Sequence, residues 1–435
     1  MTRRAAILLL LLCGSRAPAQ PLTLAETPKP GDCAKYAIDL VVTGNLLLTQ
    51  DGRREPVKLE ARARHVFAER TLAVDAGLPQ RSARFYDAAS TSAIVGGERF
   101  DHDLSADRRL VVALRNPDGL FCFAAAGPLT RDELDLVSEH FNPQCLAGLL
   151  PGKEVNSNDT WPVSHPAAQT ACQFDGLIKN GLIGKLTEVK DGVATFTIEG
   201  TAEGIENGAK VTLGVAATGK FDLASKRVAE LTWRQKDDRE QGPVNPASQV
   251  EATVTLRREM LAAEPKELTE AALAAVPKAE VPPALTQLRH ADPKGRYQIV
   301  YPRDWHVIGQ TDTHLILRLL ERGEFIAQAT VSVWKSQPPG KHVAADEFKK
   351  AVSEAPGWML GRVLEEGELP AGEGRWLYRL SAEGKMDGLP LVQSFHLLAG
   401  PQGDHVVVTF AMKPEKVKAV GSRDVSLVNA IEFRK

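Results

Sequence analysis

The chain has 435 residues, of which 43% are apolar and 25% are charged, and its formal net charge is -2. This composition is typical of a globular protein, and at roughly 100–200 residues per domain the length predicts two or three domains. The balanced charge, without a run of Lys and Arg between aromatic residues, argues against nucleic-acid binding.

Residues 1–19 have the three parts of a secretory signal peptide. Arg3 and Arg4 give a positive start, residues 5–12 form an apolar run, and residues 17–19 (Ala-Pro-Ala) match an A-x-A cleavage site. The apolar run is too short to span a bilayer, and no later segment reaches 18 consecutive apolar residues. We therefore predict an exported protein, periplasmic or extracellular, with no transmembrane segment in the mature chain.

Cys13 offers a second way of targeting, because the cysteine of a lipobox becomes lipid-modified. A lipobox has a small residue directly before this cysteine, whereas here the preceding residue is Leu12. Lipid anchoring at Cys13 is therefore the less favoured alternative to cleavage after Ala19.

The predicted mature chain retains four of the five cysteines. An even number in an oxidising compartment favours disulfides, and three connectivities are possible. We prefer a bridge that closes a short loop, and zinc binding is less expected because no C-x2-4-C pair occurs. The preferred pair is Cys145 and Cys172, and the other two candidates are Cys33 and Cys122.

Residues 30–261 are predicted to form one antiparallel β-rich domain. Its strand-like segments alternate apolar and polar residues, which is the period of a half-buried strand. Asp191-Gly192 and Asn207-Gly208 are turns of the kind that antiparallel hairpins require. The clearest strands are residues 36–42, 194–199 and 250–256.

One helix is predicted to cross this sheet. Thr130 and Glu133 form a capping box, and Leu134, Val137 and Phe141 follow at the spacing of one apolar helix face. A strand-rich unit with a crossing helix and an export signal resembles the LolA-type lipoprotein-carrier fold, a curved half-barrel. This similarity rests on the arrangement of elements and on no residue motif.

Residues 262–293 are predicted to be a connector between two domains. Lys266–Val276 is rich in Ala, Glu and Leu and is expected to form a short helix. Four prolines follow, and they stiffen a chain without letting it join a sheet. They are Pro277, Pro282, Pro283 and Pro293.

Residues 294–435 are predicted to form a second domain with strands and two helices. The helices are expected at residues 344–355 and at residues 422–431, where Val425, Val428 and Ile431 would point inward. The expected strands are residues 295–301, 329–334, 374–382, 391–398 and 405–412.

Two short motifs mark the start and the end of the second domain. Gly295–Trp305 reads Gly-x-Tyr-x-Ile-x-Tyr-Pro-x-Asp-Trp, and residues 430–433 read Ala-Ile-Glu-Phe. In these motifs the domain resembles the PsbP-like family, which includes the extrinsic photosystem II subunit and bacterial envelope proteins. The resemblance implies an antiparallel sheet flanked by helices and a function through binding partners, with no shared catalytic residues. The expected fold class of the whole chain is therefore α+β.

No local pattern predicts an active site. The sequence contains no Gly-x-Ser-x-Gly, no Walker-type phosphate loop and no His-Glu-x-x-His. Residues 101–103 (Asp-His-Asp) could hold a metal only in a loop, and we interpret them as a polar hairpin turn after Phe100. Residues 138–140 (Ser-Glu-His) lie on one helix, where consecutive side chains diverge.

Several tryptophans have two interpretations. Residues 156–160 contain a glycosylation sequon at Asn158, but we interpret the segment as a turn that delivers Trp161 to the core. Four tryptophans of the second domain are expected mainly in the core or over a sheet edge. If two were exposed together, they would favour a carbohydrate- or peptide-binding surface. These four are Trp305, Trp334, Trp358 and Trp376.

We therefore expect a non-catalytic envelope or secreted protein that binds a protein partner or a lipid-like apolar ligand, with no cofactor or metal. A ligand-binding version requires an apolar groove of roughly 300 Å³ or more. The first alternative is a hydrolase with dispersed acidic residues, which a cleft holding two carboxylates of raised pKa would favour. The second is a structural or assembly protein, which large exposed apolar patches without a pocket would favour.

Overall fold

The computed structural model describes residues 21–50, 53–116, 119–138, 141–372 and 374–434. The predicted signal peptide and Cys13 lie outside these residues, as do residues 139 and 140. Over the described ranges the protein is rich in antiparallel β-sheet and has only short helices. None of the described helices is long and apolar enough to cross a membrane.

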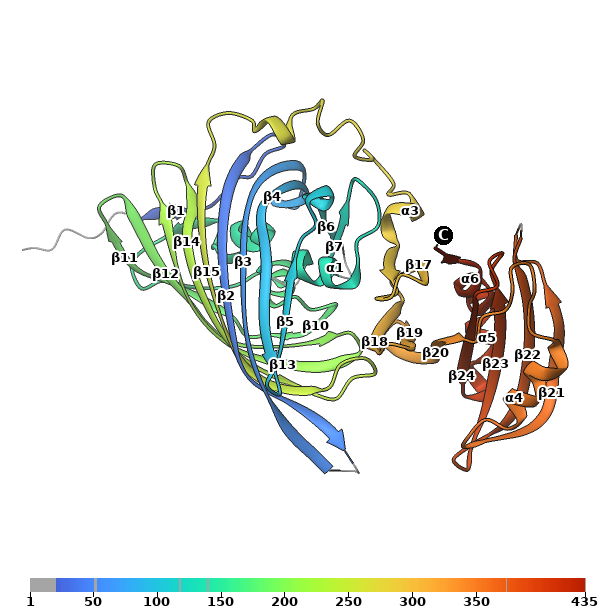
Figure 1. The fold of residues 1–435 in the computed structure, drawn as a ribbon. Helices are drawn as coiled ribbons and strands as arrows, with labels where there is room; N and C mark the ends of the chain where they lie inside the picture. Colours follow the sequence, from blue (N-terminus) through green and yellow to red (C-terminus); the bar gives the residue numbers. More distant parts are fainter. Residues whose placement is uncertain (1–20, 51–52, 117–118, 139–140, 373, 435) are drawn as a thin grey trace, which may run out of the picture.

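The N-terminal region forms one strongly curved sheet of 13 strands (Figure 1). The main strand order is β7-β6-β4-β3-β2-β15-β14-β13-β12-β11-β9, with β5 beside β4 and β10 beside β12. The edge strands β7 and β9 have no pairing with each other in the described chain, so the sheet is open. The strands are β2 (Cys33–Gln50), β3 (Arg53–Asp75), β4 (Leu78–Val95), β5 (Glu98–Asp103), β6 (Leu110–Asn116), β7 (Gly119–Ala124), β9 (Thr160–Pro162), β10 (Gly176–Asn180), β11 (Ile183–Lys190), β12 (Val193–Glu206), β13 (Ala209–Asp222), β14 (Arg227–Arg239) and β15 (Ala247–Met260).

Alternation of side chains explains why this sheet has an apolar concave face. Along β13, Val211 and Leu213 are buried on the concave side, whereas Lys210 and Thr212 are exposed on the convex side. The predicted turn at Asn207-Gly208 is confirmed, because both residues have the positive φ angles (48° and 79°) that a tight hairpin turn needs.

Short helices lie on the concave side of the sheet (Figure 1). They are α1 (Arg131–Ser138), the 3-10 helix η2 (Pro143–Leu149) and α2 (His165–Cys172); η1 (Ala106–Arg108) and the strand pair β1 (Leu22–Leu24) and β8 (Lys153–Val155) complete the region. The predicted capping box of α1 is confirmed. The Thr130 hydroxyl accepts the Glu133 N–H at 3.1 Å, and the Glu133 carboxylate accepts the Thr130 N–H at 2.8 Å.

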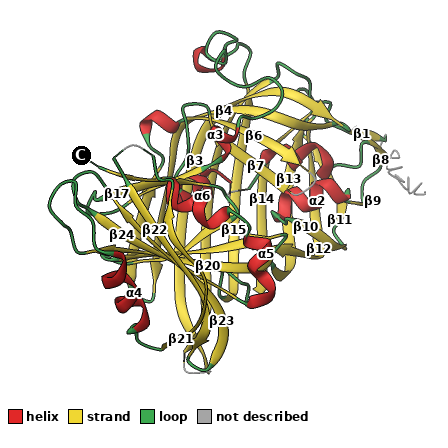
Figure 2. Ribbon diagram, turned by 90° about the vertical axis from the view of Figure 1, so that its right-hand side faces the viewer, coloured by secondary structure: helices red, strands yellow, loops and turns green. Residues whose placement is uncertain are grey.

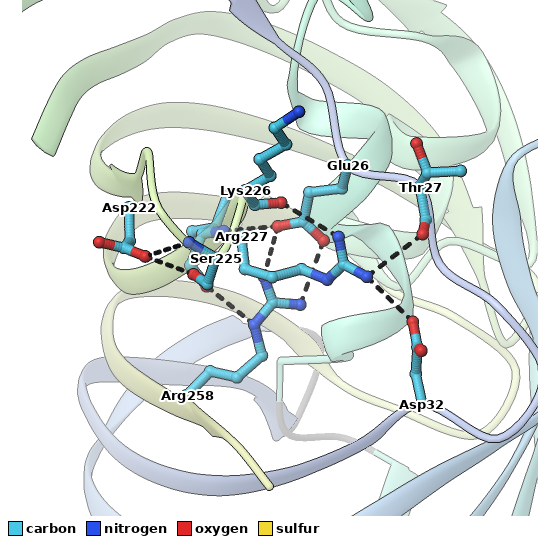
Figure 3. Close-up of polar contacts among 9 residues, drawn as sticks. Glu26, Thr27, Asp32, Asp222, Ser225, Lys226, Arg227 and Arg258 are labelled. Atoms are coloured by element: carbon cyan, nitrogen blue, oxygen red, sulfur yellow. Dashed lines mark hydrogen bonds and ion pairs between the residues drawn. The ribbon is translucent and has the colours of Figure 1, made fainter. Parts of the chain in front are cut away.

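A buried ion pair attaches the N-terminal segment to the sheet (Figure 3). The carboxylate of Glu26 accepts hydrogen bonds from the guanidinium of Arg258 on β15 and, at 2.5 Å, from the N–H of Val228 on β14. Beside it, Arg227 donates to the carbonyl of Thr27 at 3.2 Å and to the carboxylate of Asp32 at 3.0 Å. These contacts fix the first described residues although most of them are in no regular element.

The predicted connector is more structured, and less helical, than expected. The helix predicted for Lys266–Val276 is wrong: only η3 (Lys266–Leu268) forms, because Leu268, Leu273 and Val276 instead pack against the N-terminal region around Phe123. The connector continues through α3 (Pro283–Thr286), and its residues 288–291 form a strand.

The C-terminal region contains a seven-stranded antiparallel sheet and a three-stranded one (Figure 2). The larger has the order β18-β19-β20-β24-β23-β22-β21, and the smaller has the order β16-β17-β25. The strands are β16 (Leu288–Ala291), β17 (Tyr297–Tyr301), β18 (Trp305–Gln310), β19 (His314–Glu321), β20 (Glu324–Trp334), β21 (Trp358–Leu369), β22 (Trp376–Met386), β23 (Leu389–Ala399), β24 (His405–Met412) and β25 (Ile431–Phe433).

Short helices cover parts of the larger C-terminal sheet. They are α4 (Ala345–Ser353), η4 (Pro414–Lys416), α5 (Val417–Val420) and α6 (Arg423–Asn429). Phe348 of α4 and Leu427 of α6 belong to different apolar clusters of the sheet. The predicted closing helix is shorter than expected: Val428 and Ile431 are buried, Ile431 already lies in β25, and Val425 is only half-buried.

The two regions touch through turns and loops. A Cβ atom added to Gly208 would overlap the backbone of Gly323 at the β19–β20 turn, so these two turns are in direct backbone contact. One apolar core cluster includes buried residues of both regions. The strands of the curved sheet all come from residues 33–260, and the exact division into domains stays a prediction.

Candidate functional site

A cavity of about 410 Å³ lies between the concave face of the curved sheet and the elements that cross it. Tyr36 and Ile38 of β2 are buried in the core, but Leu40, Val42 and Leu46 farther along the strand are only half-buried. The sheet therefore extends beyond the helices that cover it. The main apolar lining residues are Leu40, Val42, Leu46, Leu59, Leu120, Leu134, Phe141, Val211, Leu213, Val250, Ala252 and Val254.

Helix α1 forms one wall of this cavity. Its capping box fixes its first turn, and Leu134 contributes to the lining. The imidazole of His65 on β3 hydrogen-bonds to the carbonyl of Leu136 at 2.9 Å, which attaches α1 to the sheet. Burial lowers the pKa of His65 to about 4, so this ring is neutral at pH 7.

The carboxylate of Asp237 lies in the wall of the cavity, between Gln235 and Arg239 along β14 and between apolar side chains on the neighbouring strands. Its neighbours across the strands are Leu213 on β13 and Val250 on β15, and both also line the cavity. Its Oδ2 accepts a hydrogen bond from Gln235 at 3.3 Å, whereas its Oδ1 is covered and has no hydrogen-bond partner among the described residues. Burial and, next, the charge of Glu206 raise the pKa of Asp237 to about 6.

A second carboxylate of raised pKa, Asp135, projects from α1 into the same cavity. Burial raises the pKa of Asp135 to about 6 although the guanidinium of Arg131 lies 3.7 Å away. Asp135 also lines an adjoining cavity of about 240 Å³, together with His65, His102 and Asp132. The criterion that would favour a hydrolase, two carboxylates of raised pKa in one cleft, is therefore met.

Arg131 connects this site to the C-terminal region. Its guanidinium donates to the carbonyls of Arg303 and Trp305, each at 3.5 Å, and it also lines the cavity. Arg303 in turn lies over the ring of Phe121 on β7, 4.2 Å from its centroid. A side chain in the wall of the cavity, Arg131, is therefore in direct contact with the C-terminal region.

The predicted disulfides are absent, and this part of the prediction is wrong. Cys33, Cys122, Cys145 and Cys172 are four free thiols, and all are buried. Cys145 and Cys172, the preferred pair, lie in the adjacent elements η2 and α2, and Cys172 also lines the cavity. Burial raises the pKa of Cys172 to about 12, and Asp237 adds to this rise, so the thiol stays protonated.

The segment around His102 is a strand, not the predicted turn. Residues 98–103 form β5, whose pairing with β4 places consecutive side chains on opposite faces. Arg99 binds the carboxylate of Asp101, and the imidazole of His102 lies 3.5 Å from Asp132 on α1. Within the described ranges no group of three or more His, Cys, Asp or Glu side chains is arranged to hold a metal ion.

The tryptophans do not form one exposed surface. Trp305 and Trp358 are buried, with 1% and 4% of their surface exposed, and they belong to different apolar clusters. Trp334 and Trp376 are half-buried beside α4. Trp161 is delivered to the core as predicted, where its indole N–H donates to the carbonyl of Leu149 at 2.9 Å.

Sequence reasoning missed both carboxylates of the cavity. Asp237 follows Leu231 and Trp233 at even spacing on one strand, and this register places it on the concave face with them. The even spacing could have been noticed in the sequence. However, the segment resembles an exposed polar strand, because charged residues alternate with these positions: Arg234, Lys236 and Asp238. Asp135 lies between two apolar positions of α1, and nothing local distinguishes it from a surface residue.

These elements define a protein with an open, curved antiparallel sheet, short helices on the concave side of that sheet, and a second β-rich region after it. Comparisons with known proteins add little to this description. No protein-family model matches the chain, and no curated protein matches it by sequence.

Solved structures resemble the chain only in part. The cyanobacterial PsbP (CyanoP) of Synechocystis is 16% identical over 34% of this chain and 93% of its own, with a TM-score of 0.27. The Ran-binding protein Mog1p of Saccharomyces cerevisiae is 14% identical over 34% of this chain and 95% of its own (TM-score 0.26). Lipovitellin is 8% identical over 56% of this chain and 27% of its own (TM-score 0.31). With TM-scores below 0.5, none of these similarities carries an argument about the function of this chain.

Proposed function

We propose that this protein is an exported, non-catalytic protein that binds an aliphatic ligand in the cavity on the concave face of its curved sheet. The observation that carries the proposal is the cavity of about 410 Å³, which exceeds the lower limit of roughly 300 Å³ for small-molecule sites. Export rests on the signal-peptide pattern of residues 1–19.

Half-buried apolar side chains give this site its driving force. A hydrocarbon chain over Leu40, Val42 and Leu46 would remove their exposed surface from water. Each buried methylene group stabilises the complex by about 0.8 kcal/mol, so ten of them would contribute about 8 kcal/mol before the cost of association. A Kd of 1 μM corresponds to about 8.2 kcal/mol, so this contribution sets micromolar affinity as the upper limit, and the cost of association makes the expected binding weaker than that.

A pair of adjacent substitutions tests the proposal. Val42 lines the cavity, whereas Val41 is 42% exposed and points to the convex side of the same strand. We expect Val42→Trp to fill the groove and weaken binding of the fluorescent probe N-phenyl-1-naphthylamine at least tenfold, and Val41→Trp to leave it unchanged. Equal binding by both variants and the wild type would show that the probe does not use this groove.

Native mass spectrometry of protein from its own source separates the remaining alternatives. A co-purifying lipid supports the proposal, and a bound protein in place of a lipid supports the partner-binding version. Met359 and Leu389 of the C-terminal region are 67% and 68% exposed, so an apolar surface exists there as well. A structural or assembly protein is expected to expose apolar patches and to have no pocket, whereas this protein also has a cavity of about 410 Å³.

A hydrolase is the second candidate, and Asp135 and Asp237 are the observation that favours it. Both carboxyl groups line the cavity with a pKa of about 6, a value suited to general acid–base catalysis. The charged neighbours of the two carboxyl groups differ, however: Arg131 lowers the pKa of Asp135, whereas Glu206 raises the pKa of Asp237. Turnover of aryl glycosides or esters that Asp135→Asn and Asp237→Asn each abolish would establish this candidate, and its absence across the panel would argue for binding alone.

A further inference from the structure

We propose that the ligand of this groove is an amphiphile with a cationic amine head group, and that Asp237 receives this head group. The inference rests on the proposed binding of an aliphatic chain and adds the chemistry of the ligand's polar end. It is argued from one carboxylate, the apolar residues that flank it on the neighbouring strands and the balance of charges around the cavity.

The position of Asp237 is unusual for a carboxylate. Leu213 and Val250 flank it on the neighbouring strands, so a chain lying across β13, β14 and β15 passes directly over it. Its Oδ1 has no accessible surface and no hydrogen-bond partner in the part of the chain that the structure describes. An unpaired buried oxygen of this kind destabilises the protein unless a donor reaches it, and a bound ligand is a natural source of that donor.

The charges around the cavity favour a cation over an anion. Its lining contains two guanidinium groups, Arg131 and Arg239, and four carboxylates, Asp135, Asp175, Glu206 and Asp237. Arg239 donates to Glu206 at 3.2 Å, and Arg131 lies 3.7 Å from Asp135. Each guanidinium is therefore opposed by a carboxylate; Asp237 feels the charge of Arg239 as well, but its hydrogen-bond donor is the neutral amide of Gln235.

An ammonium group supplies what this site lacks. Its N–H groups can donate to the carboxylate of Asp237 once the side chains that cover Oδ1 move aside, and its charge compensates the carboxylate after the chain has displaced water from the groove. A hydroxyl head group would supply one donor and no charge. A carboxylate head group would add a like charge beside Asp237 and Glu206, which disfavours binding.

Three probes of equal chain length test the head group. We would measure displacement of N-phenyl-1-naphthylamine by dodecylamine, 1-dodecanol and laurate, each below its micelle concentration or solubility limit, on the purified protein at pH 7.5. The wild type should bind dodecylamine at least tenfold more tightly than dodecanol and should bind laurate most weakly. Asp237→Asn should abolish the advantage of the amine. Asp238→Asn is the matched control, because Asp238 is the next residue on β14 and is exposed on the convex side.

The outcomes distinguish this inference from the proposed function. If the three probes bind equally, or if laurate binds best through the unpaired Nε atoms of Arg131 and Arg239, the inference fails while chain binding stands. If the preference for the amine survives in Asp237→Asn, the assignment to Asp237 is wrong. If none of the probes displaces the dye, the proposed function itself fails. The comparison of the three probes on the wild type tests the preference for an amine head group even if a variant does not fold.

Discussion

Removal of the Glu26 side chain should destabilise the fold more than any loss of a surface charge. Glu26 and Arg258 keep only 3% and 7% of their side-chain surface exposed, and they join the N-terminal segment to β15 (Figure 3). In Glu26→Ala the guanidinium of Arg258 stays in this buried site, where it retains a hydrogen bond to the carbonyl of Val228 at 2.8 Å. It then has no carboxylate to balance its charge.

The expected cost follows from the burial of the pair. Breaking a buried ion pair by removing one partner costs about 3–5 kcal/mol, a large part of the 5–15 kcal/mol that typically separates folded from unfolded proteins. Replacing both partners, as in Glu26→Leu with Arg258→Met, removes the unbalanced charge and should recover most of this loss. Urea unfolding followed by tryptophan fluorescence and circular dichroism measures both free energies.

A surface pair on the same sheet provides the control. Lys220 and Glu230 are 53% and 50% exposed and lie 2.8 Å apart, so Glu230→Ala should cost less than about 1 kcal/mol. If Glu26→Ala is no more destabilising than Glu230→Ala, the N-terminal segment is not held by this pair. If the double variant is as unstable as Glu26→Ala, the unbalanced charge of Arg258 is not the cause of the loss.

Three further predictions concern a turn, a titrating group and the thiols. Gly208→Ala should destabilise the protein more than Gly192→Ala, because both glycines have similar positive φ angles (79° and 77°) but only Gly208 touches the backbone of Gly323; equal urea midpoints would contradict this contact. The folded-state pKa of Asp237, about 6, lies above its ordinary value of 3.8, so its contribution to stability is present at low pH and is lost as the pH rises through 6. The urea midpoint of the wild type should therefore fall relative to that of Asp237→Asn between pH 4 and pH 7, and a constant difference would refute the shift. Finally, Ellman's reagent should find the four thiols of the described chain only after unfolding, and rapid reaction of the native protein would show that they are accessible.

Periodic features of the fold were predictable from the sequence, since they depend on local chemistry. The strands at 194–199 and 250–256 lie within β12 and β15, and the capping box begins α1. Each of these signals repeats at the period of its own element or uses a hydrogen bond between near neighbours. Curvature, by contrast, depends on how many strands pair and in which order, and this information is spread over the whole region.

The connector and the polar side chains of the cavity show where local reasoning fails. Lys266–Val276 has the composition of a helix, but burying Leu268, Leu273 and Val276 against the N-terminal region stabilises an irregular path instead. Asp237 is polar like its neighbours on β14, and only the register of the whole strand places it on the concave face. The sites that matter for binding are thus set by tertiary structure rather than by residue type.

The free cysteines do not argue against export, although the predicted disulfides followed from it. Disulfides are most necessary in small secreted domains that cannot build a sufficient apolar core. Here one apolar cluster extends through both regions and includes the buried thiols of Cys122 and Cys145. Burial raises the pKa of both thiols, and a protonated, covered sulfur reacts slowly with oxidants. A curved sheet held by such a core needs no covalent bridge to stay folded.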